Sequence, residues 1–332
     1  MSKKVKHILA TNEAIVVYII IALCTLIGIV NPAFFGVSTV ITLSRAMLIT
    51  LIFATCEMIV IISGGIDVSF PAVACIAMYS TIRFLLAFEI DSPVIAYLCV
   101  SVIGLLFGAL NAYLIAKIKL PPLIATLGVS SVANGATLAF LGTKEISNIP
   151  EKIDALSKVF ILSYTNPQGI TYQLTVMFLI PLCMILAAFY ILKYTMLGRG
   201  IYAIGGDKNA ARIAGFNVTK IQFIVYMTSG LFAGIGGLTY TILMRQASPQ
   251  SLMGSEMMVI AAVVVGGTRI TGGHGTMIGT VLGVLLIAIV QNNLIMLGIP
   301  THYQTFVVGL IIVIGTSITS LRAKKIANSA KV

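Results

Sequence analysis

Polar side chains inside long apolar runs are the first candidates for chemistry in this chain. Glu57, Arg83 and Asn111 each interrupt an apolar run, and Asp67 follows a pair of glycines. An ionised group within a membrane is costly unless it faces a partner or water, so such groups are typical of solute and ion pathways. Two structural alternatives stay open: Glu57 and Arg83 could pair with each other, and Asp67 could cap the N-terminus of a helix.

Two Gly-Gly pairs break the apolar runs. The first stands before Pro71 in SGGIDVS (63–69), and the second opens GGTRITGGHG (266–275). Non-helical backbone inside a membrane has to be satisfied by protein or water, so each break predicts a polar surrounding. Transport proteins use broken helices to place backbone dipoles near a solute. We therefore expect the following residues to line a translocation path: Glu57, Gly64, Gly65, Asp67, Asn111, Gly266 and Gly267.

A third feature is the long polar stretch 193–222, which is strongly basic. It carries a single acid, Asp207, against these bases: Lys193, Arg199, Lys208, Arg212 and Lys220. Asp207 can cap a short helix by accepting backbone N–H bonds, and Gly215 can end that helix. The stretch therefore predicts a small cytoplasmic helix that a partner could bind. A solvated loop that is kept inside by its positive charge is the alternative.

No constellation for catalysis or metal binding stands out. The sequence has no phosphate-binding G-x-x-x-x-G-K-[ST], no G-x-S-x-G and no H-E-x-x-H. Its three histidines have no second ligand at metal-binding spacing. The five cysteines lie inside apolar runs, as small buried hydrophobes do, so we expect neither a disulfide nor a metal site. An intramembrane enzyme thus lacks a nucleophile and a base, and no catalytic residue is assigned.

The composition indicates which elements must position these groups. With 58% hydrophobic and 9% charged residues and a mean hydropathy of +1.06, the chain is expected to be an all-α polytopic membrane protein. The expected spans are 14–30, 47–63, 71–88, 93–115, 121–142, 174–192, 223–244, 257–267, 276–297 and 303–321. That gives about ten transmembrane helices with two broken or re-entrant segments, one at each Gly-Gly pair. The span 257–267 is too short to cross the membrane.

Loop charges orient these spans. Most of the 21 Lys and Arg residues fall on the side of the N-terminus, which the positive-inside rule places in the cytoplasm. Both termini are then cytoplasmic, with tails 1–13 and 322–332 flanking one transmembrane domain, 14–321. Arg45 and the loop Thr143–Tyr172 fall outside. The net charge of +11 is explained by this asymmetry, so no nucleic-acid partner is expected.

Two periodic patterns refine the picture. Ile153, Leu156 and Phe160 recur at helical spacing in the outer loop and predict a short amphipathic helix on the external face. Glycines four residues apart predict helices that approach each other closely in the membrane. The glycines concerned are Gly104 and Gly108, Gly230 and Gly234, and Gly275, Gly279 and Gly283.

The motifs together resemble the permease subunits of ribose-type ABC importers, the second carbohydrate-uptake family of bacterial binding-protein-dependent transporters. The resemblance rests on SGGIDVS (63–69), GALNAYLI (108–115), PPLIATLG (121–128), GRGIYAIGGDKNAARIAGFNV (198–218) and AAVVVGGTRITGGHGTMIGTVLG (261–283). It covers nearly the whole chain except the termini and the outer loop 143–172. The residues at Glu57, Phe70-Pro71 and Asn134 depart from the family's usual pattern near the expected path, so no particular sugar is assigned.

The resemblance implies a permease of the bacterial inner membrane that passes a monosaccharide or a sugar-like solute. The stretch 193–222 would hold a coupling helix that docks into a cytoplasmic ABC ATPase. Its coupling residues would be Gly205, Gly206, Asp207, Asn209, Ala210, Arg212 and Gly215. A second permease copy or a related permease, an extracytoplasmic solute-binding protein and membrane lipid would be the other partners. ATP and Mg would bind to the ATPase, and this chain would hold no cofactor.

An ion-coupled secondary transporter is the alternative in another class. It would also explain the broken helices, with Glu57 or Asp67 as a proton or sodium site. It would not need the basic stretch 193–222, whereas a permease without an ATP site of its own does need a contact with an ATPase.

Overall fold

The computed structural model describes residues 12–293 together with 303, 306, 309, 310 and 313. Within them, seven helices are long and apolar enough to cross a membrane. These are α2 (Asn12–Val30), α3 (Val37–Ile62), α4 (Phe70–Ala87), α5 (Pro93–Ala112), α6 (Pro122–Ala136), α8 (Leu179–Tyr194) and α11 (Val218–Met244). The prediction of a helical polytopic membrane protein is therefore confirmed.

The remaining elements are short. Helices α9 (Met196–Gly206) and α10 (Lys208–Ile213) follow α8, and the apolar helices α12 (Glu256–Val265) and α13 (Met277–Asn293) follow α11. The outer loop holds α7 (Glu151–Ser157), β1 (Phe160–Thr165) and β2 (Thr171–Thr175). Single turns and helix extensions complete the described elements: Pro32–Phe35, Tyr113–Lys117, Thr137–Leu141 and Val176–Phe178.

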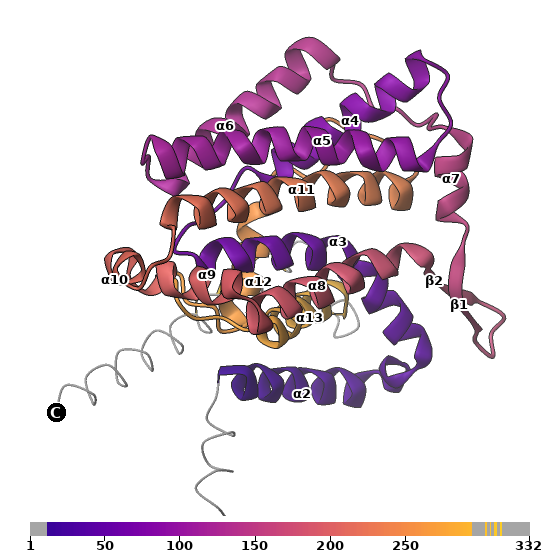
Figure 1. The fold of residues 1–332 in the computed structure, drawn as a ribbon. Coiled ribbons are helices and arrows are strands. Elements are labelled where there is room, and N and C mark those ends of the chain that lie inside the picture. Colours follow the sequence, from indigo (N-terminus) through magenta and orange to yellow (C-terminus); the bar gives the residue numbers. More distant parts are fainter. Residues whose placement is uncertain (1–11, 294–302, 304–305, 307–308, 311–312, 314–332) are drawn as a thin grey trace, which may run out of the picture.

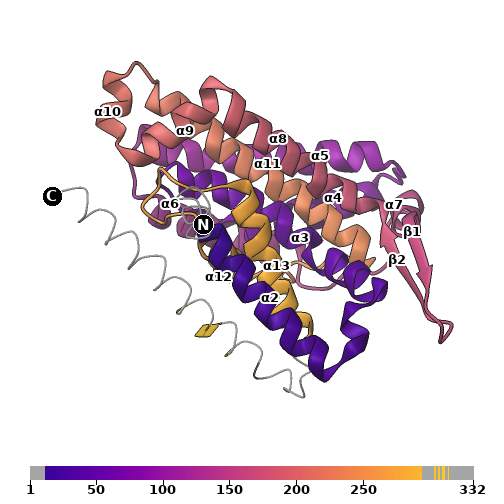
Figure 2. The same cartoon turned by 90° about the horizontal axis from the view of Figure 1, so that it is seen from below.

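The helices are stacked side by side in layers (Figures 1 and 2). Helices α3, α4 and α11 form the core and are mostly buried, whereas α2, α5, α6 and α8 leave wide apolar faces exposed. Such faces suit contact with lipid or with a partner subunit, because removing apolar surface from water is favourable. Helix α12 has 10 residues, so its length is about 15 Å, roughly half of a bilayer's hydrocarbon core. This matches the predicted half-helix.

Helix α3 starts earlier than predicted. The expected span 47–63 placed Arg45 in an outer loop, but α3 begins at Val37 and Arg45 is an exposed residue on it. Thr39, Ile41 and Leu43 are buried while Val37 and Val40 are exposed, so polar and apolar side chains do not separate onto two faces, and periodicity does not mark the start of the helix. The tails 1–11 and 322–332, residues 294–297 and most of the predicted span 303–321 lie outside the described residues.

Helices α5 and α11 pack backbone against backbone. A Cβ atom added to Gly104 would overlap the carbonyl oxygen of Gly230, and one added to Gly230 would overlap that of Gly104. Gly108 and Gly234 make similar contacts one turn away. The predicted role of these four glycines in close helix packing is confirmed.

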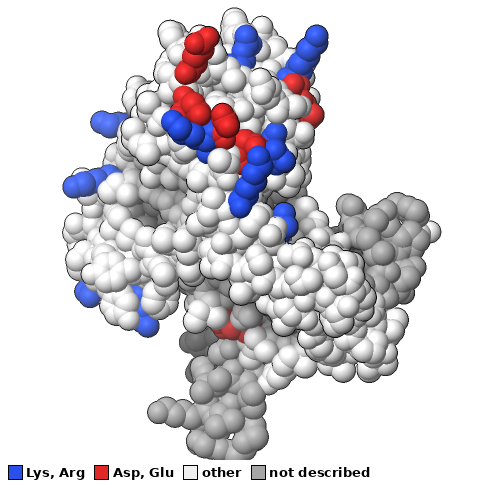
Figure 3. All heavy atoms as spheres, turned by 90° about the vertical axis from the view of Figure 1, so that its right-hand side faces the viewer, with Lys and Arg blue, Asp and Glu red and all other residues white. Residues whose placement is uncertain are grey.

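The outer loop is only partly helical. The predicted amphipathic helix forms over 151–157, with Ile153 buried, but Phe160 starts β1 instead of ending the helix. Strands β1 and β2 form an antiparallel hairpin in this loop, beside the helical membrane domain. Figure 3 looks onto this end of the molecule, where acidic and basic side chains gather on an otherwise largely uncharged surface.

One ion cluster joins this outer loop to the end of α11. Arg245 donates from Nε and one terminal nitrogen to Asp154 at 2.5 and 2.9 Å, and Lys158 Nζ lies 2.8 Å from the same carboxylate. The hydrogen bonds from Arg245 and Lys158 lower the pKa of Asp154 to about 2, so the carboxylate is charged at neutral pH. The cluster therefore fixes α7 over the outer end of the helices.

The predicted orientation can be tested with cysteines placed in this loop. Lys152→Cys and Lys158→Cys should react with an impermeant thiol reagent added to intact spheroplasts, because both side chains lie exposed on the outer loop. Lys208→Cys at the opposite end should react only after the membrane is opened, and the unsubstituted chain gives the background. Protection of positions 152 and 158 until the membrane is opened would reverse the topology.

Candidate functional site

The basic stretch forms the capped helix that its sequence predicts. Asp207 Oδ1 accepts the backbone N–H groups of Asn209 at 2.7 Å and Ala210 at 3.0 Å, so Asp207 is the N-cap of α10. The N–H groups of Ala210 and Asn209 lower the pKa of the Asp207 carboxyl. Gly215 has φ +88° and ends the turn after α10, which is a conformation that glycine adopts without strain.

Helix α10 presents an exposed surface that combines charge with an apolar side chain. Asn209, Ala210 and Arg212 are exposed, and Ile213 is 89% exposed. A large apolar side chain that is open to water beside charged residues suits a contact with another protein. Sequence reasoning missed Ile213, although an isoleucine in a polar stretch outside any span was a readable signal.

The two glycines at the end of α9 face different surroundings. A Cβ atom on Gly206 would meet no other atom within 4 Å, so this position is open for a partner. A Cβ atom on Gly205 would overlap the carbonyl oxygen of Ile62 and would lie 2.6 Å from the backbone nitrogen of Gly273. Gly205 was predicted as part of the coupling surface, but its contacts point into the protein.

Three distant segments meet at Gly205 and form what we call the glycine junction, defined as Gly64, Gly205, Gly272 and Gly273. The backbone N–H of Gly273 donates to the Ile62 carbonyl at 2.9 Å, which joins the second break to the end of α3. Gly64, Gly272 and Gly273 have φ between +70° and +88°, a region that favours glycine. The junction therefore connects α9 directly to both helix breaks.

The first break also carries a buried polar network, in which Asp67 is the main acceptor. Its Oδ1 accepts the N–H of Ser69 at 2.8 Å and the hydroxyl of Ser69 at 2.6 Å, and its Oδ2 accepts the hydroxyl of Ser229 at 2.7 Å. Asn111 donates from Nδ2 to Ser69 Oγ at 2.8 Å. Asp67 thus joins the break to α5 and α11, and it binds the N–H of Ser69, the residue directly before α4.

Glu57 belongs to the same network. Its Oε1 accepts the backbone N–H of Asp67 at 3.3 Å, and both residues are at most 1% exposed. The possible ion pair between Glu57 and Arg83 is wrong, because Arg83 donates to the carbonyl oxygen of Leu141 instead. The structure therefore brings together Glu57, Asp67 and Asn111 from the predicted path residues, inside the packed protein.

The predicted Gly266 and Gly267 lie apart from this network. A Cβ atom on Gly266 would overlap the carbonyl oxygen of Gly279, so Gly266 serves the close packing of α12 on α13. Gly267 has φ +100° and ends α12. The later pair, Gly272 and Gly273, makes the contact with the first break. Sequence reasoning missed this pair as site residues, together with Ser69 and Ser229.

Comparison with known proteins adds the following findings. Residues 38–315 match a family described as branched-chain amino acid transport system / permease component. The chain is 31% identical over 299 residues to the ribose import permease protein of Escherichia coli (strain K12), which covers 89% of this chain and 90% of the relative. It is 32% identical to that of Bacillus subtilis (strain 168), covering 88% of each chain.

A further relative is named for a different sugar. The chain is 28% identical over 320 residues to the fructose import permease protein of Rhizobium meliloti, which covers 95% of this chain and 88% of the relative. No solved structure matches the chain.

Proposed function

The chain belongs to the family of branched-chain amino acid transport system / permease components, and we propose that it forms the path for a monosaccharide or a sugar-like solute through an ABC importer. It is a multi-pass membrane protein and a transport subunit, not an enzyme. The similar proteins named as ribose and fructose import permeases support a sugar as the solute. Residues 14–321 serve as one transmembrane permease domain in the inner membrane.

The glycine junction is the observation that carries this proposal. A force on the cytoplasmic helix α10 passes through the capping residue Asp207 to α9, which ends at Gly206. Gly205 touches the backbone of both helix breaks without an intervening side chain. Closely packed backbone yields little under load, so a displacement of α9 has to move the breaks. This is the mechanical connection that an importer driven from the cytoplasm requires.

The energy for this movement comes from a separate subunit. The chain carries no phosphate-binding G-x-x-x-x-G-K-[ST] motif, so ATP and Mg are bound by the partner ATPase. The ATPase binds the exposed surface of Gly206, Ala210 and Ile213 on the cytoplasmic side. Arg212 adds positive charge to this surface.

Further partners complete the importer. A second permease, identical or related, covers part of the exposed apolar helices, and the translocation path runs between the two subunits. The polar network of Glu57, Asp67 and Asn111 lies close to this path and holds the first break. An extracytoplasmic solute-binding protein docks on the outer face around α7 and the hairpin, where the charged side chains gather (Figure 3).

Substitutions at the end of α9 and on α10 test the coupling contact. Ile213→Asp and Gly206→Leu should leave the protein in the membrane, because both positions are open. Each should reduce co-purification of the ATPase and the stimulation of ATP hydrolysis by loaded binding protein by about tenfold or more, since losing a central apolar contact costs about 2 kcal/mol.

Ile161→Asp on the outer strand β1 is the matched control for the co-purification measurement, because Ile161 is 50% exposed at the opposite end of the molecule. It should leave the association with the ATPase unchanged. Normal stimulation in both Ile213→Asp and Gly206→Leu would refute the assignment. Solute uptake by the purified chain alone in liposomes with an ion gradient would instead favour the secondary transporter.

A further inference from the structure

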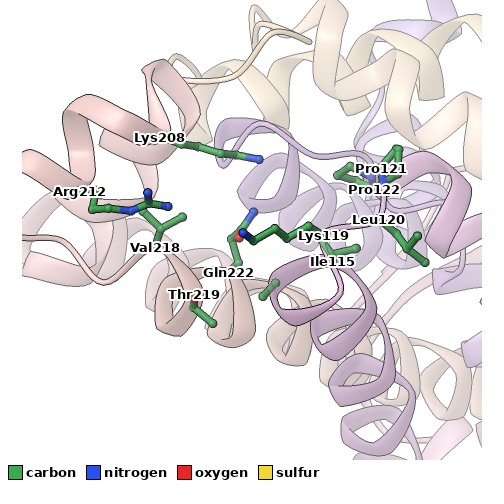
Figure 4. Close-up of a pocket in the computed structure, with 11 residues that line it drawn as sticks. Ile115, Lys119, Leu120, Pro121, Pro122, Lys208, Arg212, Val218, Thr219 and Gln222 are labelled. Carbon is green, nitrogen blue, oxygen red and sulfur yellow. The ribbon is translucent and has the colours of Figure 1, made fainter.

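A pocket of about 300 Å³ opens beside α10 at the cytoplasmic end (Figure 4). Its walls come from α10, from the first turns of α11 and from the connection between α5 and α6. These segments are far apart in the sequence. The pocket is therefore created by the fold, at the level where the spanning helices α6 and α11 begin.

The pocket is strongly basic. Lys119, Lys208 and Arg212 line it, and Figure 4 shows their charged ends directed toward the same space. No acidic side chain is among its lining residues, and the three cations form no ion pair with any residue that the structure describes. Lys119 has φ +66°, a conformation that is uncommon for a lysine. Positive charges gathered without a counter-ion favour an anionic ligand.

Gln222 provides an independent sign of a ligand. The residue is only 8% exposed, and its side-chain amide lies at the pocket and makes no hydrogen bond with the described part of the chain. An amide held at a pocket wall without a protein partner is free to bind a ligand there. A ligand with acceptor oxygens would satisfy this amide and the three cations together.

The surface next to the pocket is apolar. Leu120 lines the pocket and is 37% exposed, and Leu123 and Ile124 continue along α6 with exposed fractions of 43% and 64%. Helix α6 is one of the helices able to cross the membrane. An anionic pocket ligand with an apolar tail would thus find a matching surface that extends toward the membrane interior.

We propose that this pocket binds the phosphate headgroup of an anionic phospholipid from the cytoplasmic leaflet, with its acyl chains along α6. Basic pockets between membrane helices on this side are suited to such headgroups. The bound lipid would tie α10 to the membrane surface through Lys208 and Arg212. This proposal rests on the membrane location of the chain and on the proposed cytoplasmic position of α10, but not on the identity of the solute.

Native mass spectrometry of the purified full chain with defined lipids tests the proposal. Phosphatidylglycerol should bind in preference to phosphatidylcholine with the same acyl chains. The double variant Lys119→Gln, Arg212→Gln should bind phosphatidylglycerol roughly thirtyfold more weakly, since each basic residue near an anionic surface contributes about fivefold. Lys220→Gln, a neighbouring cation that does not line the pocket, should bind it normally.

Three outcomes would overturn the proposal. The first is equal binding of the two lipids, or unchanged binding in the double variant. The second is complete displacement of the lipid by inorganic phosphate at millimolar concentration, which would show a site for a free anion. The third is loss of lipid binding whenever the ATPase is bound, which would assign the pocket to an acidic side chain of that partner.

Discussion

Gly205→Ala is expected to abolish solute uptake. The added methyl group would overlap the carbonyl oxygen of Ile62 and press on the backbone nitrogen of Gly273, which donates to that same oxygen. No flexible side chain can yield at this point, so α9 or one of the breaks has to move. Overpacking of this kind typically costs about 1–3 kcal/mol of unfolding free energy. Uptake should fall further than stability, because the junction transmits the movement.

Gly135→Ala is the matched control for this experiment. It makes the same change on α6, outside the ATPase surface, where an added Cβ atom meets nothing within 4 Å. Uptake of labelled sugar should be compared with the amount of each variant in the membrane and with its thermal unfolding in detergent. If Gly205→Ala transports like Gly135→Ala, the glycine junction does not couple α9 to the breaks.

Asp67→Leu should lose nearly all uptake, whereas Asp67→Asn should retain part of it. Leucine removes the acceptor of two hydroxyl groups and one backbone N–H, all of them buried with Ser69 and Ser229. A buried donor left without a partner costs about 1–3 kcal/mol. Asparagine keeps one acceptor oxygen at the same place, so it should preserve part of the network that joins the break to α5 and α11.

Association with the ATPase should remain intact in both Asp67 variants, because α10 lies elsewhere. Asp91→Leu and Asp91→Asn serve as controls, since Asp91 accepts one backbone N–H, from Lys152, on the outer side. They should transport like the unsubstituted protein. Equal and near-normal uptake in the two Asp67 variants would make Asp67 an incidental cap, and the search for solute contacts would move to Glu57 and Asn111.

Local signals in the sequence predicted local structure well. The cap at Asp207, the stop at Gly215 and the break at Gly64-Gly65 each depend on neighbouring residues, and all three are confirmed. The packing of α5 on α11 also followed from glycine spacing. The predicted start of α3 was wrong because Arg45 was taken as a loop residue, although it is an exposed residue inside the helix.

The meeting of distant segments could not be predicted from the sequence. Ser229 lies 162 positions from the Asp67 carboxylate that it binds. The contact of Gly205 and Gly273 with Ile62 uses only backbone atoms, so the residue types at these three positions give no sign of it. The pairing of Arg245 with Asp154 likewise depends on how α7 folds back onto the end of α11. Such contacts follow from the complete fold.

The backbone character of the glycine junction also has a genetic consequence. A harmful substitution in a side-chain core can be compensated when a neighbouring large residue becomes smaller. At Gly205 the opposing atoms are the Ile62 carbonyl oxygen and the Gly273 nitrogen, which every residue type carries. No single exchange of a facing residue can make room there. Suppressors of Gly205 substitutions should therefore be true revertants. Over evolution, changes at this position should not be accompanied by compensating changes at the residues that face it.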